Sequence, residues 1–94
     1  MAIKKVIISG SAKKDLRKVP MFIVRKLLTW VDAVEIEGLE EVRKCGGYHD
    51  EPLFGKRRGQ HSIRLSKSYR AIYTIRNQYR EAFINIEEVS KHDY

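Results

Sequence analysis

Helix-type patterning near the N-terminus and strand-type patterning in the second half of the chain restrict the fold more than any other feature. Apolar residues recur at steps of three and four from Ile23 to Val34, the spacing of one helix face, and Phe22 and Trp30 are expected to widen this stripe. From His61 onward, β-branched and aromatic residues form short runs separated by short turns. We therefore expect an α+β domain with N-terminal helices packed on one face of a small antiparallel sheet.

The positions of individual elements follow from capping residues and periodicity. Ser11 can cap a short helix, Pro20 suits the first residue of a second helix, and Gly38 interrupts that second helix. The expected elements are a strand within residues 4–9, helices at 12–18, 20–37 and 39–44, and strands at 61–66, 69–75 and 82–89.

Alternation along the strand at 61–66 predicts which side chains face the core. Ile63 and Leu65 are expected to point into the core. Ser62, Arg64 and Ser66 share the opposite face. Arg64 is therefore expected to be free to meet a ligand.

Length and composition indicate one folded domain, residues 1–94. Apolar residues make up 43% of the chain and charged residues 33%, a globular composition. No apolar run approaches the roughly 18 residues that a membrane span needs, and the first residues open no signal-peptide hydrophobic region, so we expect a cytoplasmic protein without a membrane partner. Cys45 is the single cysteine, which excludes an internal disulfide.

The positive charge is concentrated in one segment. The chain carries 19 Lys and Arg against 12 Asp and Glu, for a formal net charge of +7. Eight of the basic residues and none of the acidic residues lie between Leu53 and Arg80. Clustered positive charge attracts polyanions, although a basic face also serves solubility. Nucleic acid is therefore the leading candidate partner.

Familiar cofactor and metal motifs are missing from the sequence. The chain has no Walker-type phosphate loop, HExxH pair, cysteine pair or dinucleotide fingerprint, and its three histidines lie far apart. We expect neither a cofactor nor a metal.

The acids, bases and cations that remain suit transesterification at an RNA phosphate. That reaction needs a base for the 2′-hydroxyl, an acid for the leaving 5′-oxygen and cations that stabilise the charged phosphorane, and none of these roles requires a metal. Glu51 is a candidate base, and His92 is a candidate acid because the unperturbed pKa of histidine lies near neutrality. Arg64 and Arg70 are candidate phosphate ligands because a guanidinium presents a planar fork of donors.

Each candidate also has a purely structural interpretation. Glu51 can be a loop acid that pairs with one of the basic residues 56–57, and Arg70 can be an exposed strand residue. His92 lies near the C-terminus, where fraying is the default, and Tyr94 can either stack on a base or cover the sheet edge. Sequence spacing alone does not separate these interpretations.

Several segments, in the right order, resemble the RelE/ParE superfamily of type II toxins, in particular its HigB and YoeB branches. The segments are residues 11–16 (SAKKDL), 50–56 (DEPLFGK), 59–65 (GQHSIRL), 69–73 (YRAIY) and 91–94 (KHDY). The resemblance covers essentially the whole chain and implies the RelE-like fold.

The resemblance also implies an activity. It implies a toxin that enters the ribosomal A site and cuts mRNA there without a metal, leaving a 2′,3′-cyclic phosphate and a 5′-hydroxyl, and it implies a cognate antitoxin protein as partner. The implied catalytic residues are Glu51 as general base, Arg64, Arg70 as the transition-state arginine, His92 and Tyr94. The residues expected to contact RNA or ribosome are Lys56, Arg57, Arg58, His61 and Lys67.

Two other functions remain open. ParE relatives share the fold but target DNA gyrase, since a fold does not fix a function, and a basic domain of this size can also be a non-catalytic RNA-binding module. Asp93 separates His92 from Tyr94, whereas YoeB-like chains have the two residues adjacent. The His-x-Tyr ending together with Glu51 favours the nuclease.

Overall fold

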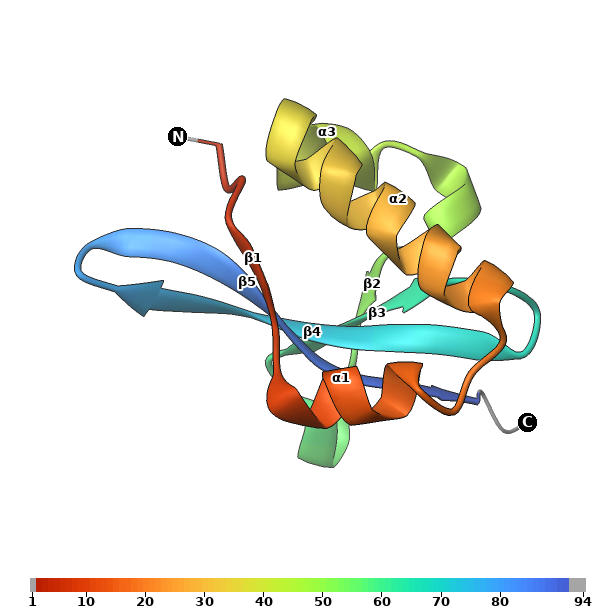
Figure 1. The fold of residues 1–94 in the computed structure, drawn as a ribbon. Coiled ribbons are helices and arrows are strands. Elements are labelled where there is room, and N and C mark those ends of the chain that lie inside the picture. Colours follow the sequence, from red (N-terminus) through yellow and green to blue (C-terminus); the bar gives the residue numbers. More distant parts are fainter. Residues whose placement is uncertain (1, 92–94) are drawn as a thin grey trace.

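The computed structural model describes residues 2–91 as a five-stranded sheet with helices packed on one face and along one edge (Figure 1). The helices are α1 (Gly10–Leu16), α2 (Met21–Glu37) and α3 (Leu39–Arg43), with short 3-10 turns η1 (Gly46–Tyr48) and η2 (Gly55–Arg57). The strands are β1 (Val6–Ile8), β2 (Glu51–Pro52), β3 (Gln60–Arg64), β4 (Tyr69–Gln78) and β5 (Glu81–Lys91). Within residues 2–91, no helix has the length and apolar content to cross a bilayer.

The α+β prediction is confirmed, and the sheet differs from the expectation at its two edges. The strand order is β1-β5-β4-β3-β2, with β1 parallel to β5 and every other pair antiparallel. A parallel pair needs a long crossover, and the helices that follow β1 supply it. The edge strand β2, only two residues long, was not expected because so short a segment shows no alternation.

The core lies between α2 and one face of the sheet. Ile23, Leu27 and Val34 are fully buried, as their helical spacing predicts. Trp30 is also fully buried, with its ring centroid 5.5 Å from that of Tyr73 on β4. Phe22 is 61% exposed, so the expectation that it widens the stripe is wrong. Phe22 is one residue, about 100° around the helix, from the buried Ile23, so its side chain faces solvent.

The short helix α1 covers an edge of the sheet rather than its face. Strand β1 ends at Ile8, so the part of β5 beyond Ile86 has no neighbouring strand on that edge. There the Ser9 hydroxyl donates to the Glu87 carbonyl, and the Val89 N–H donates to the Asp15 carboxylate at 2.9 Å. Helix α1 therefore takes the place of a neighbouring strand.

The helix boundaries differ slightly from those expected. Ser9, not Ser11, is the N-cap of α1, and its hydroxyl accepts the Ala12 N–H at 3.0 Å. Pro20 is the residue before α2 rather than its first residue. Gly38 ends α2 with φ 89°, a left-handed conformation that favours glycine, and a Cβ there would lie 2.9 Å from the Ala2 Cβ.

The β4–β5 hairpin projects beyond the body of the molecule and ends in a strained turn (Figure 1). Tyr79 and Arg80 both adopt left-handed backbone conformations, with φ of 52° and 64°. Two such residues in a two-residue turn match a type I′ geometry, which normally selects Asn-Gly. Non-glycine residues in this region store roughly 1–2 kcal/mol each.

Replacing Arg80 with glycine is expected to stabilise the protein. Release of the strain outweighs the added entropy of an unfolded glycine, so the free energy of unfolding should rise by about 0.5–1 kcal/mol. For a domain of this size, thermal denaturation should show Tm higher by roughly 2–8 °C. Arg80→Ala removes the same charge but keeps a Cβ, and it should give no gain. Equal stabilisation by both variants would assign the effect to charge instead of backbone strain.

Candidate functional site

A pocket opens on the sheet face opposite α2, at the end of the sheet where β3 turns into β4. Ile63 and Leu65 point into the core with at most 4% exposure, so the residues that alternate with them, Ser62, Arg64 and Ser66, face the other way. The residues that line the pocket are His49, Glu51, Ser62, Arg64, Ser66, Lys67, Tyr69 and Arg70. The predicted alternation of residues 61–66 is therefore confirmed.

Strand register brings the candidate base and the candidate phosphate ligands to this pocket. Glu51 on β2 pairs directly with Ser62 on β3. Two residues further along β3, Arg64 pairs directly with Arg70 on β4. Residues opposite one another in an antiparallel pair project from the same face, with Cβ atoms about 4.5–5.5 Å apart. Three residues of the predicted catalytic set thus line one pocket.

The two arginines form an electrostatically unfavourable pair. Like charges directly opposite one another destabilise a sheet, and no acidic side chain within residues 2–91 forms an ion pair with Arg64 or Arg70. Arg70 is half-buried, and its Nε atom is buried without a hydrogen-bond partner among those residues. An anion bound between the two guanidinium groups would offset the repulsion between their charges and give the Arg70 Nε atom an acceptor.

Several pocket residues were not singled out as site residues from the sequence. Ser62 and Ser66 share the face of Arg64, so alternation had already placed them there. His49 lies two residues before Glu51 and has φ 46°, and Tyr69 begins β4 beside Arg70. His49 precedes β2 and has a left-handed backbone, so strand alternation gave no sequence signal for its place in the pocket.

The basic residues around η2 lie outside the pocket lining. Lys56 and Arg58 are exposed. Arg57 donates to Gln60 on β3 at 3.1 Å and to Glu88 on β5 at 3.0 Å, so its guanidinium spans β4. Lys56 and Arg58 remain available to a partner, whereas the charge of Arg57 is used to hold η2 on the sheet.

His61 lies on the other face of the sheet from the pocket. Its ring stacks on Tyr73 with centroids 5.0 Å apart and an interplanar angle of 13°. Burial, followed by the positive charge of Arg43, lowers the pKa of His61 below its usual value, against the opposing effect of Asp50. The structure therefore does not bring His61 together with Glu51, Arg64 and Arg70.

The remaining predicted residues are divided between the pocket and the tail. Lys67 lines the pocket from the β3–β4 turn. His92 and Tyr94 lie outside the described residues, so their predicted roles stay predictions. Among residues 2–91, no three His, Cys, Asp or Glu side chains gather as a group able to hold a metal ion.

The fold is similar to those of several solved toxins, although no known family profile or curated protein matches the sequence. The YoeB/ParE toxin from Agrobacterium tumefaciens superposes with a TM-score of 0.69 at 18% identity, covering 95% of this chain and 99% of that one. YafQ from E. coli gives 0.67 at 18% identity, covering 95% and 93%. YafQ in the DinJ–YafQ toxin–antitoxin complex of E. coli gives 0.63 at 21% identity, covering 96% and 94%.

The chain has the RelE/ParE toxin fold. In this protein the RelE/ParE sheet carries a carboxylate, two opposed guanidinium groups and two serine hydroxyls on its open face. Such a set can take up a proton beside a phosphate group and hold the phosphate by charge-assisted hydrogen bonds.

Proposed function

We propose that this protein is the toxin of a type II toxin–antitoxin pair and that it inhibits translation by cutting mRNA bound to the ribosome. The observation that carries the proposal is the meeting of Glu51 with the opposed Arg64 and Arg70 in one pocket. The likeness to toxins of the RelE/ParE fold supports it.

The proposed reaction is a metal-independent transesterification. Glu51 removes the proton from a ribose 2′-hydroxyl, and the resulting oxygen attacks the adjacent phosphorus. Arg64 and Arg70 stabilise the negative charge that gathers on the phosphorane oxygens. The bond to the 5′-oxygen then breaks, with His92 proposed as the acid that protonates this oxygen and Tyr94 as a base-stacking residue. The products are a 2′,3′-cyclic phosphate and a 5′-hydroxyl end.

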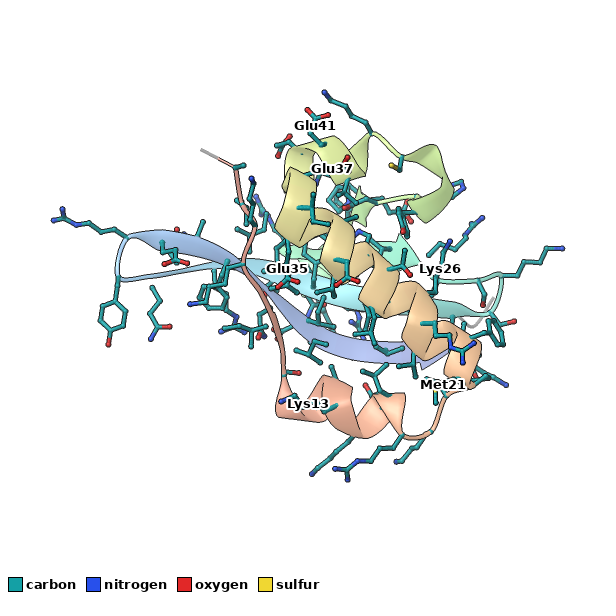
Figure 2. The ribbon with its side chains drawn as sticks, turned by 45° about the horizontal axis from the view of Figure 1, so that its top comes forward. Lys13, Met21, Lys26, Glu35, Glu37 and Glu41 are labelled. Atoms are coloured by element: carbon teal, nitrogen blue, oxygen red, sulfur yellow. The ribbon has the colours of Figure 1, made fainter. Side chains whose placement is uncertain are left out.

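The distribution of charge supports a polyanionic partner on the pocket side. Figure 2 shows Glu35, Glu37 and Glu41 on the C-terminal half of α2 and on α3, in the helical layer. The pocket lies across the sheet from α2. Apart from His49 and Glu51, its lining residues come from the segment between Leu53 and Arg80, which contains no acidic residue. We propose that ribosome-bound mRNA approaches this face, with Lys56, Arg58 and Lys67 at its border.

A cognate antitoxin is the second proposed partner, and the cytoplasm is the proposed compartment. One solved protein with this fold, YafQ, is recorded in complex with DinJ. We propose that an acidic or apolar segment of the antitoxin covers the basic face between Lys56 and Arg80 and blocks Arg64 and Arg70.

The test is primer extension on mRNA bound to programmed ribosomes, using EDTA-treated wild-type protein and the His92→Ala variant, with magnesium retained only for the ribosome. Wild type is expected to give discrete cuts that the variant loses. Cuts by both proteins would support the nuclease activity and contradict the role of His92 as the acid.

Absence of cuts from wild-type protein would contradict the proposed function and direct attention to the two alternatives. A DNA supercoiling assay then separates them, because a gyrase-directed toxin inhibits supercoiling and a simple RNA-binding module does not. The RNA-binding module would show salt-dependent RNA affinity that Glu51 and His92 substitutions leave unchanged.

A further inference from the structure

A buried polar network lies beneath the pocket, on the face of the sheet that packs against the helices. The Tyr73 hydroxyl donates to the Asp50 carboxylate, with distances of 2.7 and 2.9 Å to its two oxygens. The Arg43 Nη2 atom donates to the same hydroxyl at 3.1 Å, and the Arg43 Nε atom lies 3.6 Å from an Asp50 oxygen. The network joins the end of α3, the middle of β4 and the residue directly before β2.

The network is built to hold a carboxylate in one place. The Asp50 side chain is only 4% exposed, and a buried charge is tolerated only when it is paired and hydrogen-bonded. The Tyr73 ring is fixed in turn by Trp30 on one side and by the stacked ring of His61. Burial and the hydrogen bond to Asp50 raise the pKa of the Tyr73 phenol, so the hydroxyl remains a donor at any working pH.

Glu51, by contrast, has little to hold it in the pocket. Its side chain is exposed and forms no hydrogen bond or ion pair within residues 2–91. The strand that carries it is two residues long, and its second residue, Pro52, has no N–H to donate. The Leu53 N–H donates to the Gln60 carbonyl at 2.9 Å just beyond the strand.

We propose that Arg43, Tyr73 and Asp50 are positioning residues that anchor β2 and thereby set Glu51 in the pocket on the opposite face of the sheet. Asp50 and Glu51 are consecutive, with Asp50 fixed on the helix-covered side and Glu51 lining the pocket on the other. Fixing the first therefore fixes the backbone of the second. For its kinetic consequence, this inference rests on the proposed cleavage function.

The test is Tyr73→Phe, which keeps the ring and its stacking and removes only the hydroxyl. Amide hydrogen exchange should show the protection of the Leu53 N–H falling by about tenfold or more, because Asp50 loses its shortest hydrogen bonds. The Ile84 N–H, which donates to the Lys5 carbonyl at 2.9 Å, serves as the internal reference and should be unchanged. The kcat of mRNA cleavage should fall about 10–100-fold, with KM within about threefold, because Glu51 is displaced but RNA binding is not.

Three further variants separate positioning from a general loss of stability. Ile84→Val removes one methylene from a fully buried core side chain on β5 and should lower stability without changing kcat or the exchange of Leu53. Asp50→Asn keeps an acceptor for the Tyr73 hydroxyl and should retain more activity than Asp50→Ala. The Asp50 pair also provides the test if Tyr73→Phe does not fold.

The outcomes are distinguishable from failure of the proposed function. Unchanged exchange at Leu53 in Tyr73→Phe would overturn the anchoring role, whatever the activity. Faster exchange with the wild-type kcat would overturn the positioning of Glu51. If the wild-type protein cuts no mRNA, the proposed function fails, and the exchange result alone decides whether the network anchors β2.

Discussion

Replacing Glu51 with glutamine is expected to slow cleavage of ribosome-bound mRNA by about 10²–10⁴-fold, the usual contribution of a general base. Glutamine has nearly the same shape but cannot take up the proton of the 2′-hydroxyl. Glu51 is exposed and forms no hydrogen bond or ion pair with the rest of residues 2–91, so the variant should fold with wild-type stability. The loss should therefore appear in kcat, with little change in ribosome affinity.

The measurement is single-turnover cleavage of mRNA on programmed ribosomes, together with thermal denaturation of each protein. Glu81→Gln is the matched control, because Glu81 is an exposed glutamate at the far end of β5 whose contact with Lys5 is 3.9 Å long. It should cleave at the wild-type rate. A wild-type rate from Glu51→Gln would remove Glu51 from the reaction and leave His49 as an alternative base in the pocket.

Replacing Arg70 with alanine is expected to reduce the cleavage rate by about 10²–10³-fold, as the loss of one transition-state stabiliser commonly does. Stability should be preserved or improved at the same time. The substitution removes a like charge directly opposite Arg64 and a buried Nε atom without a partner among the described residues. Activity falling while stability holds is the behaviour expected of a residue kept for function.

Arg76→Ala is the matched control for Arg70→Ala. Arg76 lies on the same strand and the same face, six residues along, and its ion pair with Glu87 is at the surface. Removal of such a pair changes stability by about 1 kcal/mol or less, and cleavage should proceed at the wild-type rate. Arg70→Lys keeps the charge without the planar fork and should recover only part of the activity. Equal rates for Arg70→Ala and wild type would contradict the phosphate-binding role.

Much of the fold could be predicted because its strongest signals are local. The stripe from Ile23 to Val34 specifies a helix with one buried face, and the alternation around Ile63 and Leu65 specifies a strand with one buried face. In the structure His61 stacks on Tyr73 on the helix-covered face, and its expected contact with RNA stays a prediction. The parallel pairing of β1 with β5 was not predictable in this way, since residues 6 and 84 meet only after the chain has folded.

The candidate site likewise contains residues that local patterns could assign and residues that only strand pairing brings together. Arg64 and the serines beside it could be assigned to the open face of their strand from the pattern of residues 61–66. That Arg70 lies opposite Arg64, and Glu51 opposite Ser62, depends on strand register. The ion pair of Arg57 with Glu88 likewise joins residues 31 apart in sequence and holds η2 on the sheet, while the expected contact of Arg57 with RNA stays a prediction.

The sequence by itself determined which residues form helices and strands, which of their faces are apolar, and that one acid-free basic segment carries the positive charge. These properties depend on backbone geometry over a few residues, and periodicity records them directly. Only the tertiary structure decided which of the polar residues meet. It placed Glu51 beside two arginines in a pocket and Asp50 beneath it against Tyr73 and Arg43. These contacts arise from strand pairing and helix packing between distant segments, which local patterns do not encode.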